Sequence, residues 1–104
     1  MICVIATIEV AEGRRQGFLT EFRKVVPKVL AEAGCLEYAP MIDVDTGIGP
    51  QLHARPDAVT IVEKWESVES LEAHLIAPHM VDYRKAVKDL VKGSSLRILS
   101  PAER

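Results

Sequence analysis

The chain has few of the residues and motifs that mark the more easily recognised protein classes. Its two cysteines, Cys3 and Cys35, have neither CxxC spacing nor the density of a disulfide framework, so we expect reduced, buried thiols. The 13 basic residues are balanced by 15 acidic ones and form no basic stripe, which argues against a nucleic-acid partner. No GxGxxG, P-loop or GxSxG motif occurs, so the sequence supports neither a nucleotide cofactor nor serine hydrolysis.

The first ten residues are apolar but do not resemble a targeting or membrane segment. They lack a positively charged n-region, and the apolar run is interrupted at Glu9 and closed by Glu12 and Gly13. We therefore expect a strand at residues 2–10, and a cytoplasmic protein with no membrane partner. Both faces of this strand are apolar, which predicts that a further layer covers the face without helices.

The whole chain, residues 1–104, is expected to form one α+β domain. Expected strands cover residues 2–10, 36–44, 59–65 and 96–99, and expected helices cover residues 13–33, a short segment after the N-cap Ser67, and Pro78 to Lys92. Pro27 predicts a kink or a break in the first helix, and Pro40 predicts an edge or bulged strand. Residues 45–57 hold the glycines and prolines of a long loop that could act as a lid.

The order β-α-β-β-α-β is typical of the ferredoxin-like fold, a four-stranded antiparallel sheet with helices on one face. In a lone domain of this type, the other face of the sheet would be exposed. Because the strands are apolar on both faces, we expect two sheets to pack face to face in a homodimer.

Two segments resemble a known family. Residues 32–38, Glu-Ala-Gly-Cys-Leu-Glu-Tyr, resemble the E-x-G-C-x-x-Y turn of antibiotic biosynthesis monooxygenase domains, also called the quinol-monooxygenase-like family. Residues 63–67, Glu-Lys-Trp-Glu-Ser, with His74 and His79 resemble their E-x-W…H…H signature. The likeness runs from the opening strand to about Leu99 and departs only in the long loop.

This resemblance implies a dimeric α/β barrel in which each protomer holds an apolar pocket between its helices and its sheet. Members of the family include cofactor-free oxygenases of polycyclic phenols and quinols, haem-degrading enzymes, isomerases of a phosphorylated sugar, and proteins without an assigned activity. The fold therefore does not determine the chemistry.

The candidate catalytic residues are His74, His79 and Glu63. An imidazole titrates near neutrality, so either histidine could remove a phenolic or enolic proton while Glu63 fixes its tautomer. The histidines could equally cap helix ends, and Glu63 could form a structural salt bridge. These alternatives stay open at the level of sequence.

Five further side chains are candidates for substrate binding: Trp65, Tyr38, Tyr83, Thr7 and Arg84. Trp65 projects from the same strand face as Glu63 and could be a flat wall for an aromatic ring or a core residue. The hydroxyls of the tyrosines and Thr7, and the guanidinium of Arg84, could donate hydrogen bonds to an oxyanion.

Neither haem nor a metal ion is expected as a cofactor. Haem-degrading members of the family use a histidine about where this chain has Tyr83, Arg84 and Lys85. His79 and Asp82 could form one ligand pair but have no third or fourth ligand nearby in sequence.

We therefore predict a cofactor-independent monooxygenase that acts with dioxygen on a quinol, phenol or related electron-rich aromatic. One alternative is an isomerase of a small carbonyl or sugar-phosphate compound, whose pocket would need an inward-pointing Arg or Lys. The other is a non-catalytic dimer that binds a small molecule.

Overall fold

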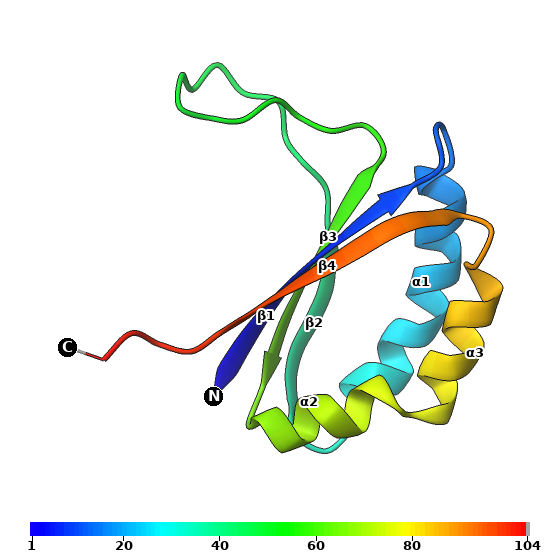
Figure 1. The fold of residues 1–104 in the computed structure, drawn as a ribbon, viewed down its shortest axis with the longest axis vertical. Helices are drawn as coiled ribbons and strands as arrows, with labels where there is room; N and C mark the ends of the chain where they lie inside the picture. The colour runs from blue at the N-terminus through cyan, green and yellow to red at the C-terminus, as the bar shows by residue number, and fades with distance from the viewer. Residues whose placement is uncertain (104) are drawn as a thin grey trace.

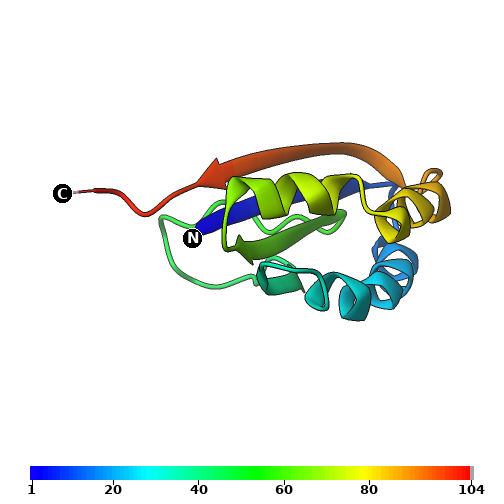
Figure 2. The same cartoon turned by 90° about the horizontal axis from the view of Figure 1, so that it is seen from below.

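A computed structural model describes residues 1–103 of the chain. The elements are β1 (Ile2–Val10), α1 (Arg15–Leu30), β2 (Cys35–Met41), β3 (Ala58–Trp65), α2 (Val68–Leu75), α3 (Pro78–Ala86) and β4 (Val91–Leu99). The strands form one antiparallel sheet in the order β2-β3-β1-β4, which is the predicted ferredoxin-like arrangement. Helices α1 and α3 lie side by side, and α2 crosses one end of the molecule in contact with β3 (Figures 1 and 2). No helix within residues 1–103 is long and apolar enough to span a membrane.

Helix α1 packs one apolar stripe against the sheet. The buried side chains of this stripe recur every three or four residues, at Phe18, Phe22, Val25 and Val29. The helix continues through Pro27, so the break that we considered does not occur. Pro27 and Arg23, whose carbonyl loses its helical partner, both lie on the exposed side of the helix, where water can replace the missing bond.

The two faces of the sheet differ in what covers them. On β3, the side chains at 59, 61, 63 and 65 are buried beneath the helices, while those at 60, 62 and 64 are only half-buried on the other side. We call this second side the helix-free face; its apolar residues are Cys3, Ile5, Ala39, Met41, Val62 and Leu99. Pro40 lies in β2, which is an edge strand as predicted.

The last helix is shorter, and the last strand longer, than the sequence predicted. Helix α3 ends at Ala86, residues 87–90 form a turn, and β4 begins at Val91. The helical pattern that we extended to residue 92 arises because Val87 and Leu90 are buried in that turn. From Val91 onward, β4 pairs with β1, with one register shift between Glu9 and Val10, and this pairing overrides the local pattern.

The long loop between β2 and β3 projects away from the helices (Figure 1). Asp43 and Arg55 form a bidentate ion pair near its base, with nitrogen to oxygen distances of 2.8 and 3.0 Å. This pairing lowers the pKa of Asp43 to about 2. The loop contributes no residue to the main cavity described below, so it does not act as the lid of that cavity in this structure.

Both cysteines are free thiols, but neither is fully buried, which corrects our expectation of buried thiols. Cys3 belongs to the helix-free face, which has no covering layer within one chain. Partial burial raises the pKa of the Cys35 thiol, and the nearby carboxylates of Glu32 and Glu63 raise it further.

We predict that Gly34→Ala destabilises the fold by about 2 kcal/mol or more, because Gly34 has a φ of +84° and a Cβ there would lie 2.2 Å from Ser70 Oγ. Gly17→Ala is the matched control, since Gly17 lies in α1 with open space around it and should gain up to about 1 kcal/mol. Urea unfolding of both variants measures the difference. Equal stability of the two would contradict the tight turn at Gly34.

Candidate active site

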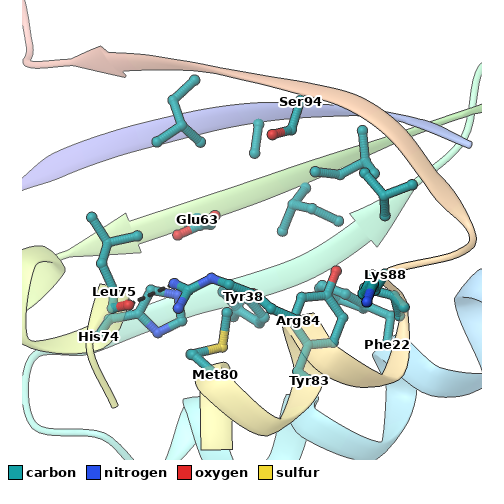
Figure 3. A pocket seen from close by; sticks show the side chains of 16 residues that line it. Phe22, Tyr38, Glu63, His74, Leu75, Met80, Tyr83, Arg84, Lys88 and Ser94 are labelled. Atoms are coloured by element: carbon teal, nitrogen blue, oxygen red, sulfur yellow. Dashed lines mark hydrogen bonds between the residues drawn. The ribbon is translucent and has the colours of Figure 1, made fainter. Parts of the chain in front are cut away.

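A cavity of about 430 Å³ lies between the helices and the sheet (Figure 3). Much of its wall is apolar, with side chains from the three helices, the turn after α3 and three strands. They include Phe22, Ile61, Met80, Val87 and Leu96. Its polar lining residues are Tyr38, Glu63, His74, Tyr83, Arg84, Lys88 and Ser94. A largely apolar hollow with a few convergent polar groups is typical of a small-molecule site.

Glu32 links the two histidines of the signature. His74 donates from Nδ1 to Glu32 Oε2 at 2.9 Å, and His79 donates from Nε2 to the same oxygen at 2.7 Å. Glu32 reaches this position because the chain reverses at Gly34, whose carbonyl accepts from the Glu66 amide at 2.8 Å and ties the turn to the start of α2. The side chain of His74 is 2% exposed, against 14% for Glu32 and 21% for His79.

The second nitrogen of His74, Nε2, faces the cavity. This nitrogen makes no hydrogen bond within residues 1–103. Every fully buried side-chain nitrogen or oxygen in that part of the chain has a hydrogen-bond partner, so Nε2 is not one of the fully buried atoms. The Nε2 atom therefore has access to open space, and His74 lines the cavity. Burial lowers the pKa of His74, although the Glu32 hydrogen bond opposes this, so His74 is a neutral base at neutral pH.

Glu63 lies on the cavity wall with one oxygen held in place. Trp65 donates from Nε1 to Glu63 Oε1 at 3.0 Å, and both side chains project from the same face of β3, as predicted. Burial raises the pKa of Glu63 to about 7, against the opposing effect of the Trp65 hydrogen bond. Glu63 is thus a carboxyl group that can either give or take a proton near neutral pH.

Aromatic rings shape the rest of the cavity. Phe22 stacks on Tyr38 with ring centroids 5.4 Å apart and meets Tyr83 edge-on at 5.7 Å. Burial is the main cause that raises the pKa of both tyrosines, so their hydroxyls stay protonated and can donate hydrogen bonds. Arg84 donates to the carbonyl of Leu75 at the end of α2, which directs its guanidinium along the cavity towards His74 and Leu75 (Figure 3).

Five of the eight predicted site residues line the cavity: Glu63, His74, Tyr38, Tyr83 and Arg84. His79 lies outside the cavity, in a shallow groove between α1 and α3. Trp65 is fully buried behind His74, with ring centroids 4.7 Å apart, so it positions cavity residues rather than forming the wall. Thr7 lies on the helix-free face, which corrects the cavity position that we expected for it.

Several residues of the site were not among our candidates. The sequence analysis mentioned Glu32 only as the first residue of the E-x-G-C-x-x-Y segment. Its place in that segment was the only feature of the sequence that could have indicated a role in the site. Lys88 and Ser94 lacked any signal, because residue 88 was assigned to a longer helix and residue 94 lay outside the expected last strand.

Glu32, His74 and His79 are also the group within residues 1–103 that could hold a metal ion. One ligand atom from each lies within 4.8 Å of the other two, a two-histidine, one-carboxylate set that can bind divalent ions. The sequence analysis considered only ligands close to His79 in the chain, and it missed this set because Glu32 lies 42 residues before His74. At the present distances the three side chains form hydrogen bonds.

Comparison with known proteins places this chain among its relatives. Residues 1–86 match the family model described as antibiotic biosynthesis monooxygenase. The chain belongs to the antibiotic biosynthesis monooxygenase family. It is 48% identical over 103 residues to "Probable quinol monooxygenase YgiN" of Escherichia coli K12, covering 97% of this chain and 98% of that protein. The Shigella flexneri protein of the same name matches with the same identity and coverage.

Solved structures support the fold. A protein from Nitrosomonas europaea aligns with a TM-score of 0.82 at 16% identity, covering 99% of this chain and all of that one. A protein from Deinococcus radiodurans aligns with a TM-score of 0.80 at 19% identity, covering 100% of this chain and 95% of that one. At such low sequence identity, the likeness to these structures shows the fold alone.

Proposed function

We propose that this protein is a cofactor-independent monooxygenase that inserts one oxygen atom of O2 into a quinol. The observation that carries this proposal is the neutral His74, fixed by Glu32 at Nδ1 and open to an aromatic-lined cavity at Nε2. Membership of the family and the name of the Escherichia coli relative support a quinol as the substrate class. A cytoplasmic location stays a prediction from the sequence.

The reaction begins with proton transfer to His74. His74 Nε2 takes the proton of one quinol hydroxyl, and Arg84 with the hydroxyl of Tyr38 or Tyr83 stabilises the resulting anion. The electron-rich ring then transfers one electron to O2, and the two radicals combine at a ring carbon that carries hydrogen. His74 returns its proton to the peroxide.

The second stage releases water. Glu63 is placed to take the proton from the carbon that carries the hydroperoxide, so that a carbonyl forms as the O–O bond breaks and hydroxide leaves as water. For 1,4-naphthalenediol the balance is C10H8O2 + O2 → C10H6O3 + H2O, a four-electron oxidation of the ring by one O2. The apolar walls keep bulk water away from the radical pair and the peroxide.

Oxygen uptake by chelator-treated protein with 1,4-naphthalenediol tests this proposal. We expect one O2 per quinol, faster than the spontaneous rate, with a hydroxyquinone as product and no dependence on added iron, zinc or manganese. Uptake no faster than in buffer would contradict the proposal. Activity that appears only with an added metal would place the chemistry at the Glu32, His74 and His79 set instead.

We also propose that the protein is a homodimer joined through the helix-free face. This face presents Ile5, Val62 and Met41 without a covering layer in the single chain, although the helical side of the central strand β3 is buried throughout. An antiparallel sheet with an apolar outer face is stabilised when a second sheet packs on it.

Val62→Asp should convert the dimer into a monomer at micromolar concentration, because it places a carboxylate in the proposed interface between its two apolar cross-strand neighbours, Ile5 and Ala39. Val68→Asp, at an exposed position of α2, is the control and should leave the dimer intact. Sedimentation velocity measures both. A wild-type protein that sediments as a monomer would contradict the dimer.

A further inference from the structure

Two cationic side chains face the same cavity, one from α3 and one from the turn that follows it. Arg84 and Lys88 are four residues apart, and both line the cavity with Ser94 of β4. Neither makes an ion pair with a carboxylate within residues 1–103, whereas Arg55 and Lys64 each have an acidic partner. The positive charges of Arg84 and Lys88 are therefore available to a ligand.

The two cations serve different ends of the cavity. The Leu75 carbonyl directs Arg84 towards the end that holds His74, where the proposed reaction forms an anion. Lys88 lies nearer the opposite end, below Ser94 in Figure 3. A substrate whose hydroxyl meets His74 would therefore extend towards Lys88.

The charge balance of the cavity favours an anion. Of the described residues that line it, Glu63 alone carries a carboxyl group, against the two cations. A neutral, purely apolar substituent would leave the Lys88 ammonium partly desolvated and unpaired on binding, which costs free energy. An anionic oxygen group would instead gain a charge-assisted hydrogen bond from Lys88 and one from the Ser94 hydroxyl.

We propose that Lys88 and Ser94 form a subsite for an anionic substituent, a carboxylate or a phosphate, so that the substrate is an anionic hydroxylated aromatic rather than a neutral lipid quinol. This inference rests on the proposed function for the identity of the ring. It adds the group that the ring carries and the residues that recognise it.

Calorimetric binding of rings that this chemistry leaves unreacted tests the subsite without turnover. The probes are 1-naphthol, 5-hydroxy-1-naphthoate and 5-hydroxy-1-naphthyl phosphate, whose anionic groups lie on the opposite side of the ring system from the hydroxyl, titrated under nitrogen. We expect at least one anionic ring to bind about tenfold or more tighter than 1-naphthol. The anion with the larger gain identifies the substituent.

Lys88→Gln should remove most of this preference and leave the affinity for 1-naphthol within about twofold, while Lys88→Glu should reverse the preference. Lys85→Gln is the matched control, because it removes the same charge three residues earlier, at the end of α3, from a position that does not line the cavity. Equal binding of neutral and anionic rings by the wild type would overturn the proposal, and so would an equal loss of preference in Lys85→Gln. Oxygenation of a neutral quinol alongside either result would leave the proposed function standing.

Discussion

Replacing His74 by glutamine should lower kcat/KM for oxygen-dependent turnover of a quinol by about 10²–10⁴-fold, the usual contribution of a general base. Glutamine fills a similar volume and keeps a polar group beside Glu32, but it cannot take a proton. His74 is the histidine with a ring nitrogen open to the cavity. Oxygen uptake at several quinol concentrations measures the effect.

His79→Gln separates the two histidines that the sequence could not distinguish. His79 contacts Glu32 at 2.7 Å but lies outside the cavity, so we expect a fall in kcat/KM of less than about tenfold, well below the loss caused by removal of a general base. Urea unfolding of both variants checks that neither effect comes from a lost fold. A larger loss of activity in His79→Gln than in His74→Gln would contradict the assignment of His74 as the general base.

The stability of the protein should fall as the pH rises through neutrality, because of Glu63. The Glu63 carboxyl has a pKa near 4.5 when unfolded and about 7 when folded, so the folded state holds more protons between these values. Raising the pH from 4.5 to above 7 should therefore lower the free energy of unfolding by up to about 3 kcal/mol.

Glu63→Gln should remove this pH dependence, since its amide oxygen can still accept from Trp65 but does not titrate. Urea unfolding at one protein concentration, at pH 5, 6, 7 and 8, gives the difference between variant and wild type. His74 titrates in both proteins, so the difference isolates Glu63. Glu72→Gln, at an exposed position of α2, controls for the loss of a charge, and parallel curves for wild type and Glu63→Gln would contradict a buried, neutral Glu63.

The fold followed from the sequence wherever a local pattern and the tertiary structure agreed. Alternating apolar residues located β1 and β3, and the stripe from Phe18 to Val29 located α1. The end of α3 was wrong because Val87 and Leu90 fit a helical stripe and a buried turn equally well. Strand pairing with β1 determined the boundary, and such pairing is not visible in a local window.

The site was predictable in its residue types but not in its connections. The signature supplied Glu63 and His74, yet the partner that orients His74 lies 42 residues earlier, beyond the reach of any spacing argument. The role of Trp65 was left open because strand alternation places it on the helix side without stating its depth. Thr7 was misplaced because the parity of β1, apolar on both faces, did not reveal which face meets the helices.

The fate of each atom of O2 tests the central claim most directly. Turnover of 1,4-naphthalenediol under ¹⁸O2, followed by mass spectrometry of the product, should give one ¹⁸O atom in the hydroxyquinone, and the same experiment in H2¹⁸O under ordinary O2 corrects for exchange with water. A product without label, formed with one hydrogen peroxide per quinol, would show that the protein only oxidises quinols and would contradict monooxygenation.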